Sequence, residues 1–282
     1  MSPDTTYLAR SADGRPLLGD ETGFVPLSAA DPGLESIEAA LPAAAAGELP
    51  DPADTPARRV PSEAIDFGLP IPRPTLGKLW GIGLNYEEHA GDLDEERPTE
   101  PASFMKPRSA AVGPGGPIRL PPEERTERVT AEAELAAVLG RSCSDVDRED
   151  VDDVVAGYLP VIDMTAEDVL ERNPRFLTRA KSFDTFLVLG PAIAVPDSPA
   201  EFAERAVRTL VNDEVIAENR TRNMLFSPRE LVAFHSRVMT LEPGDVISTG
   251  TPGAGVISPG DRVRSEVEGI GSVAADVVGR QR

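Results

Sequence analysis

Short apolar runs, bounded by glycine, proline or charged residues, recur along the chain and predict a protein built mainly from β-strands. The run from Val129 to Gly140 is β-branched and apolar and is closed by a glycine, so it predicts a strand. Asp245–Thr249 predicts another strand because it follows a turn at Pro243-Gly244. Val211–Val215, with Asn-Asp at its centre, predicts a hairpin turn.

Helix signals are fewer and are local. Ser227-Pro-Arg-Glu230 places a serine at the N-cap, a proline at the first helical position and a glutamate at the third. Thr165 with Asp168 gives a second capping-box pattern. Behind the first cap, three apolar residues are spaced for one helical face: Leu231, Phe234 and Val238. Since short strands dominate, the sequence predicts an α+β fold.

The first part of the chain differs in composition from the rest. Residues 1 to about 60 are rich in alanine, proline and acidic residues, and the segments Tyr7–Arg10 and Gly23–Leu27 predict short strands there. Three prolines between residues 70 and 74 mark a stiff, extended connector. We therefore expect a small N-terminal subdomain over 1–74 and a catalytic domain over 75–282 that begins near Leu79–Gly83.

The balance of charge narrows the partners of the protein. A net charge of −20 argues against a nucleic-acid partner, which needs a basic face. Of 28 basic residues, three are lysines: Lys78, Lys106 and Lys181. An acidic, lysine-poor, arginine-rich chain indicates a halophilic organism, because molar salt screens surface repulsion. The alternative explanation is a GC-rich genome.

Other residue counts exclude several kinds of site. Cys143 is the single cysteine, so intrachain disulfides and cysteine zinc sites are excluded, and two histidines are too few for a multi-histidine metal centre. The chain shows no secretory signal, and Leu41–Ala46 is too short to span a bilayer. We therefore expect a cytoplasmic protein that has no membrane partner.

Three acidic residues carry the strongest chemical signal. Glu132 and Glu134 lie on the predicted strand Val129–Gly140, so they project from the same face with Cα atoms about 7 Å apart. Asp163 ends the apolar run Tyr158–Ile162, where an unpartnered carboxylate is costly. One divalent cation would satisfy all three, and oxygen ligands select Mg²⁺ first, with Mn²⁺ or Ca²⁺ as substitutes. The alternative is a wet strand face with a hydrogen-bonded aspartate.

Six motifs in a fixed order connect this trio to a known family. From roughly residue 78 to 280 the chain resembles the fumarylacetoacetate hydrolase family. The resemblance implies a layered mixed-β fold of the C-terminal domain of that family, a small N-terminal domain and a homodimer. The motifs that carry it are Gly83–Ala90, Phe104–Ala110, Glu132-Ala-Glu134, Asp163–Asp168, Arg179–Asp184 and Thr249–Pro252.

The resemblance assigns roles to the charged residues of these motifs. It implies that Lys181 lies beside the metal and points at the oxygens of the substrate, and that His89 pairs with an acid three residues on. That position holds Asp92, where the family has glutamate. Either Asp92 partners His89, or a nearby acid (Asp94, Glu95 or Glu96) substitutes, or the pair is weakened and the chemistry needs no activated water.

Further residues are candidates for binding the substrate. Lys106 is either a substrate-side cation or part of a structural ion pair, and Arg179 is a candidate for a substrate carboxylate. Gly250 and Thr251 lie in a turn that the resemblance places at the pocket. Two other residues are predicted to have no catalytic role: Trp80 as a core residue and His235 as a helix-surface or partly packed residue.

The resemblance implies an enzyme that acts on small 2-oxo or 1,3-diketo acids. The leading hypothesis is a Mg²⁺-dependent hydrolase that cleaves a C–C bond of an acylpyruvate. The alternative keeps the metal site but works as an isomerase, tautomerase or decarboxylase of hydroxy-diene dioates or oxaloacetate-like acids. A third hypothesis is a catalytically silent binding protein.

Overall fold

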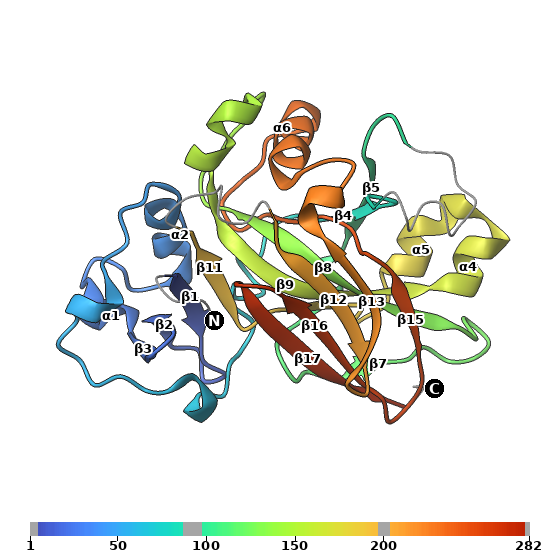
Figure 1. Cartoon of the computed structure of the whole chain (residues 1–282), viewed down its shortest axis with the longest axis horizontal. Coiled ribbons are helices and arrows are strands. Elements are labelled where there is room, and N and C mark those ends of the chain that lie inside the picture. Colours follow the sequence, from blue (N-terminus) through green and yellow to red (C-terminus); the bar gives the residue numbers. More distant parts are fainter. Residues whose placement is uncertain (1–4, 87–97, 197–203, 280–282) are drawn as a thin grey trace.

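The computed structural model describes residues 5–86, 98–196 and 204–279, which form two β-sheets with a few short helices (Figure 1). The strands of the larger sheet are β1 (Thr6–Arg10), β2 (Pro16–Asp20), β3 (Gly23–Pro26), β4 (Leu79–Gly83), β5 (Ala102–Lys106), β6 (Ala111–Val112), β8 (Val129–Leu139), β9 (Val155–Ala166), β10 (Leu187–Leu189), β11 (Ala192–Val195), β14 (Val246–Ser248) and β15 (Ala254–Ile257). The smaller sheet contains β7 (Ile118–Arg119), β12 (Ala206–Val211), β13 (Glu214–Arg220), β16 (Arg262–Val267) and β17 (Gly271–Val278). Within these ranges the α-helices are α1 (Leu27–Ala30), α2 (Ile37–Ala45), α4 (Glu167–Arg172), α5 (Leu177–Lys181) and α6 (Pro228–Val238).

The antiparallel pair β8 and β9 forms the centre of the larger sheet, whose main path runs β3-β2-β1-β11-β9-β8-β14-β4-β5. Every residue of both strands is buried, because the smaller sheet contacts them through β12 and β16 and helix α2 packs against β9 (Figure 1). A strand covered on both faces needs a nearly continuous apolar sequence, which Val129–Leu139 has apart from Thr130 and its two glutamates. This arrangement confirms the predicted α+β fold.

Several local predictions are confirmed. The apolar run at Val129 is β8, and the segment after Pro243-Gly244 contains β14. Strands β12 and β13 are joined at Asn212 and Asp213, which have φ angles of 51° and 65°. Two consecutive residues in the left-handed region fit a two-residue hairpin turn, where asparagine and aspartate are favoured.

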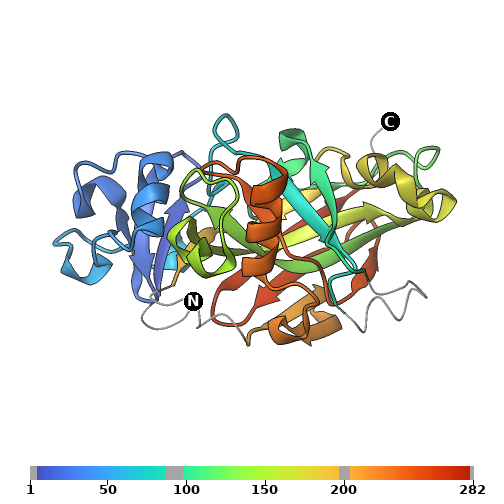
Figure 2. The ribbon, with the colours of Figure 1, turned by 90° about the horizontal axis from the view of Figure 1, so that it is seen from above.

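The N-terminal strands extend the larger sheet. Strand β1 pairs antiparallel with β11, with Leu8 opposite Ile193, and β2 and β3 follow outward from β1. Figures 1 and 2 show these blue strands at one end of the long axis of the molecule. The division of the chain into subdomains at residues 74 and 75 stays a prediction.

Helix α6 begins at the predicted cap but buries a different face. Ser227 accepts from the backbone N–H of Glu230, and the Glu230 carboxylate accepts from the N–H of Ser227 at 2.8 Å, so the capping box is confirmed. Val238, expected on the buried face, is 56% exposed, whereas Leu231 and His235 are fully buried. The apolar pattern therefore predicted the helix correctly and its orientation only in part.

The prediction for His235 was wrong. Its Nδ1 lies 2.6 Å from the carbonyl oxygen of Leu231, its Nε2 lies 2.7 Å from the hydroxyl of Ser103, and its ring packs against Trp80 with centroids 4.6 Å apart. Burial lowers the pKa of His235, so the imidazole is favoured in its neutral form. His235 thus links α6 to the strands β4 and β5.

The second predicted capping box was also wrong. Thr165 belongs to β9, and Ala166 occupies the N-cap of α4 without a side-chain cap. The hydroxyl of Thr165 donates instead to Glu132, and Asp168 accepts from the hydroxyl of Thr126. The buried strand β9 therefore continues to Ala166, four residues beyond the end of the apolar run at Ile162, and carries Asp163 in its interior.

Candidate metal centre

Glu132, Glu134 and Asp163 meet at the centre of the larger sheet. The pairing of β8 with β9 places Asp163 directly opposite Glu132, and the alternation of side chains puts Glu134 on the same face. One carboxylate oxygen from each residue lies within 4.8 Å of the others. The three residues are 7%, 1% and 0% exposed, respectively. The alternative of a wet strand face is therefore wrong.

Two lysines lie against these carboxylates. Lys181, in the last turn of α5, has its Nζ 2.8 Å from Oε2 of Glu132 and 3.5 Å from Oδ2 of Asp163. Lys106, at the end of β5, pairs with Oδ1 of Asp163. Three carboxylates and two ammonium groups, all ionised, leave a net charge of −1 in a buried space. A cation is the natural complement of that charge.

Lys106 has an acceptor for each of its ammonium hydrogens. Besides the pair with Asp163, it donates to the carbonyl oxygens of Met164 at 3.1 Å and of Phe186 at 2.6 Å. An ammonium group has three N–H donors, so this set uses all of them. The geometry favours the structural ion pair over the substrate-side cation for Lys106.

Burial and crowding shift the pKa values of the charged groups. Burial, reinforced by Asp163, raises the pKa of Glu134 to about 8, and burial also raises that of Asp163. Burial lowers the pKa of Lys106 to about 8. Burial opposes the charge of Lys181 as well, but its three carboxylate neighbours outweigh this effect and raise its pKa. Without a metal, the centre therefore favours a bound proton near neutral pH.

Hydrogen bonds from neighbouring residues orient the two glutamates, and Lys181 donates to Oε2 of Glu132 at 2.8 Å. Glu132 accepts from Thr165 on Oε1 at 2.7 Å, and Glu134 accepts on Oε2 from the hydroxyl of Ser248 at 2.5 Å and from the N–H of Gly250 at 2.7 Å. Asp163 contacts the ammonium groups of Lys106 and Lys181, and its oxygens accept no hydrogen bond from a hydroxyl or a backbone N–H of the described residues. A buried carboxylate held in this way, beside two glutamates, fits a hard divalent cation such as Mg²⁺ or Mn²⁺.

The remaining candidates fall in three places. Gly250 is at the centre through its N–H, and Thr251 exchanges hydrogen bonds with Gly253 within the same turn. Arg179 is exposed and lies over the ring of Phe176 at 5.9 Å. His89 and Asp92, with the alternative acids at 94–96, lie outside the described residues.

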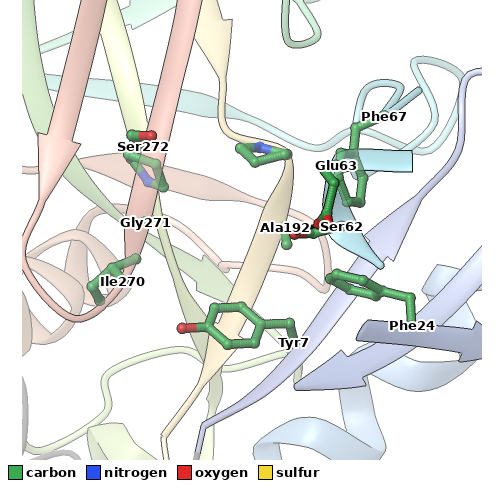
Figure 3. Close-up of a pocket in the computed structure, with 11 residues that line it drawn as sticks. Tyr7, Phe24, Ser62, Glu63, Phe67, Ala192, Ile270, Gly271 and Ser272 are labelled. Carbon is green, nitrogen blue, oxygen red and sulfur yellow. Dashed lines mark hydrogen bonds between the residues drawn. The ribbon is translucent and has the colours of Figure 1, made fainter. Parts of the chain in front are cut away.

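A cavity of about 270 Å³ lies apart from this centre (Figure 3). Tyr7 and Phe24 of the N-terminal strands lie on one side of the cavity, and Ile270–Ser272 lie on the other. Ala192 of β11 also lines the cavity. None of the three acidic residues lines this cavity. It is therefore distinct from the candidate metal centre.

The sequence model of the fumarylacetoacetate (FAA) hydrolase C-terminal family matches residues 78–278. The chain belongs to the fumarylacetoacetate hydrolase family. An oxaloacetate tautomerase of Xenopus laevis is 37% identical over 223 residues, which cover 76% of this chain and 69% of the relative. Relatives of the chain within the family thus include an enzyme.

Solved structures of the family match nearly the whole chain. The structure of 5-carboxymethyl-2-hydroxymuconate delta-isomerase from Mycobacterium smegmatis is 33% identical, with a TM-score of 0.76 and coverage of 99% of this chain and 100% of that chain. A maleylpyruvate hydrolase from Sphingobium sp. SYK-6, in complex with manganese(II) and pyruvate, is 30% identical, with a TM-score of 0.76 and coverage of 98% and 100%. A related structure therefore binds a divalent metal.

No helix within the described ranges of this chain is long and apolar enough to cross a membrane.

The structure adds residues to which the motifs assigned no role at this centre. Thr165 and Ser248 donate hydrogen bonds to the two glutamates, and Asn85 is buried close to Gly250. The hydroxyl of Tyr86 is buried without a partner among the described residues. A signal for Thr165 was available, because it follows Asp163 by two positions and so shares its strand face. No comparable signal existed for Ser248, whose contact with Glu134 spans 114 residues.

Proposed function

We propose that the protein is a divalent-metal-dependent enzyme of small 2-oxo acids, and that it hydrolyses a C–C bond of an acylpyruvate. The observation that carries the proposal is the buried set of Glu132, Glu134 and Asp163 with Lys181 against two of them. The related maleylpyruvate hydrolase supports it, because that structure holds Mn²⁺ together with pyruvate. Pyruvate is the 2-oxo acid that the cleavage of an acylpyruvate releases.

The described residues supply charge stabilisation. A Mg²⁺ or Mn²⁺ ion held by the three carboxylates would act as a Lewis acid toward the keto oxygen of the substrate. Lys181 stays protonated at neutral pH, because its carboxylate neighbours raise its pKa. Two carboxylates flank its ammonium group, which leaves a third N–H donor for an oxygen on which enolate charge develops. Lys181 would thus stabilise the departing enolate.

Hydrolysis also requires a group that activates water. We assign this role to His89, oriented by Asp92, because imidazole titrates near neutral pH and a neighbouring carboxylate fixes its orientation. Asp92→Asn should then reduce acylpyruvate cleavage by about 10²-fold or more, the scale of acid–base catalysis. Asp92→Glu should be tolerated, because a longer side chain keeps the carboxylate within reach. If Asp92→Asn leaves hydrolysis unchanged, this assignment is wrong and the acids at 94–96 are the next candidates.

The second candidate is a tautomerase of oxaloacetate-like acids. The relative from Xenopus laevis favours it, since that protein is an oxaloacetate tautomerase. Tautomerisation needs the enolate stabilisation that the centre offers and a residue that moves a proton, but no attacking water. Both candidates therefore share the metal ligands and Lys181, and they differ in the role of His89.

One experiment tests the proposal and separates the two reactions. The purified protein is assayed with an acylpyruvate and with oxaloacetate, first with Mg²⁺ or Mn²⁺ and then with a chelator. We expect activity only with metal, and Lys181→Met should lower it by about 10²- to 10³-fold. Lys78→Met is the control, because Lys78 pairs with Asp245 and Glu242 and does not contact the acidic trio. Full activity in the chelator would refute the proposal, and turnover of oxaloacetate alone would replace hydrolysis with tautomerisation.

We further propose Mg²⁺ as the resident ion and a homodimer as the assembly. An all-oxygen ligand set suits Mg²⁺, and Mn²⁺ has the same preference for oxygen. Reconstitution of the metal-free protein with each ion ranks them by activity, and light scattering on the eluting protein gives its mass. A monomer would contradict the second part of this proposal.

A further inference from the structure

Asn85 is the most fully engaged amide side chain near the metal centre. It lies two residues beyond β4 and is 1% exposed. Its Nδ2 donates to the carbonyl oxygens of Thr249 at 2.6 Å and of Phe226 at 2.9 Å, and its Oδ1 accepts from the N–H of Phe226 at 2.9 Å. Its backbone oxygen also accepts from the N–H of Leu225 at 2.8 Å. These bonds fix the direction of its side chain.

The peptide unit between Thr249 and Gly250 is bound on both of its sides. Its carbonyl oxygen, which belongs to Thr249, accepts the 2.6 Å hydrogen bond from Asn85. Its N–H, which belongs to Gly250, donates the 2.7 Å hydrogen bond to Oε2 of Glu134. A peptide unit is planar, so its carbonyl and N–H groups rotate together. The orientation that Asn85 imposes on the carbonyl is therefore passed to the N–H that holds Glu134.

The backbone at Gly250 depends on this close approach. Gly250 has a φ of +95°, and a Cβ atom there would lie 2.8 Å from Cβ of Asn85 and 3.1 Å from the carbonyl oxygen of Ile82. On the other side of Asn85, Leu84 has a φ of 56°, which is uncommon for a residue other than glycine. The chain thus accepts an unusual backbone on both sides of this contact.

We infer that Asn85 is a positioning residue for the metal ligand Glu134 and acts through the Thr249–Gly250 peptide. With Oε2 of Glu134 held by Gly250 and Ser248, Oε1 accepts no hydrogen bond from the described residues and is left for the cation. This inference rests on the proposed metal-dependent function. Groups that orient metal ligands typically change metal affinity by about 10- to 100-fold when they are removed. Because Asn85 acts through one intervening peptide, we expect the lower value.

The experiment measures Mn²⁺ affinity by calorimetry for wild type, Asn85→Ala and Asn85→Leu. Leucine keeps most of the volume of asparagine but donates no hydrogen bond, so it separates the hydrogen bond from the packing. Asn219→Ala is the matched control, since Asn219, on β13 of the smaller sheet, is also a buried asparagine, 9% exposed, and accepts a hydrogen bond from Asn223. We expect both Asn85 variants to bind Mn²⁺ about tenfold more weakly, and the control to bind like wild type.

Hydrogen exchange of the Gly250 amide in the metal-free protein gives a second readout. Both Asn85 variants should exchange this hydrogen faster than wild type, while the amides of β12 and β16 keep their protection. If the Asn85 variants fold and bind Mn²⁺ as tightly as wild type does, the inference is overturned. It is also overturned if neither variant folds, because Asn85 would then be required for folding rather than for positioning Glu134. If wild type itself binds no Mn²⁺, the proposed function fails, and unchanged Gly250 exchange in the variants would refute the inference separately.

Discussion

Lys106→Met removes a buried cation whose partners can be counted, so its cost can be worked out from the structure. The Lys106 side chain is 2% exposed and Asp163 is fully buried. Methionine keeps most of the side-chain length but leaves the carboxylate without this partner and removes one donor from each of two carbonyl oxygens, those of Met164 and Phe186. Removing one member of a buried ion pair costs about 3–5 kcal/mol. Since Lys181 stays 3.5 Å from Asp163, we expect a value near 3 kcal/mol.

A matched lysine elsewhere in the chain provides the control. Lys78 also pairs with a fully buried aspartate, Asp245, at 2.8 Å, but Asp245 keeps hydrogen bonds from the N–H groups of Lys78 and Glu242 at 2.6 and 2.8 Å. Lys78→Met should therefore cost only about 1 kcal/mol. The difference of about 2 kcal/mol corresponds to about 4 °C in the thermal midpoint of a chain of this size.

The assay is thermal and urea unfolding of both variants in a chelator, and again in excess Mn²⁺. A bound cation satisfies Asp163, so Mn²⁺ should narrow the gap between Lys106→Met and wild type. Equal losses for the two lysine variants in the chelator would refute the reasoning. A raised KM with unchanged stability would instead show that Lys106 contacts the substrate.

Other consequences can be measured in the same protein. Mn²⁺ at a hundred times its dissociation constant should stabilise the fold by about 2.7 kcal/mol, and a thermal midpoint that ignores the ion would exclude a specific site. The metal needs the ionised form of Glu134, whose pKa burial raises to about 8. Mn²⁺ affinity should therefore fall as the pH drops below about 8 and level off above that pH. An affinity that does not change between about pH 6 and 9 would contradict this prediction. Tyr86→Phe removes a buried hydroxyl that has no partner among the described residues. The change should leave the free energy of unfolding unchanged or raise it by about 1 kcal/mol, which denaturant titration measures. A decrease of more than about 1 kcal/mol would show that the hydroxyl has a hydrogen-bond partner. If the net charge of −20 is an adaptation to salt, the thermal midpoint should rise as KCl approaches molar concentration, whereas a flat midpoint would favour genome composition.

Local sequence patterns predicted the parts of the centre that depend on one strand. Glu132 and Glu134 share a face because side chains alternate, and this needs no knowledge of the partner strand. The register that sets Asp163 opposite Glu132 is different, because it passes through an irregularity at Val138 and Leu139 and a connection of fifteen residues between β8 and β9, from 140 to 154. Strand alternation alone does not fix that register.

The errors have the same origin. His235 was expected at the helix surface or partly packed, because a polar residue in an amphipathic helix usually faces water. Its burial depends on Ser103 and Trp80, which are more than 130 residues away in the sequence. Thr165 was expected to cap a helix because a hydroxyl before an acidic residue is the local signal for a cap. The carboxylate of Glu132, brought close by sheet pairing, offered a buried acceptor instead.

The pairing of β1 with β11 also covers an edge of the larger sheet that could otherwise pair with another chain. Strand β11 bonds to β9 only at the Ala194–Tyr158 position, so its other side would become a free edge if the N-terminal strands were deleted. All four of its residues, from Ala192 to Val195, are apolar and buried. An uncovered apolar edge is a template for pairing with another chain. Strands β1, β2 and β3 therefore cover this edge against aggregation. We expect a chain shortened by these strands to keep the candidate metal centre and to become less soluble.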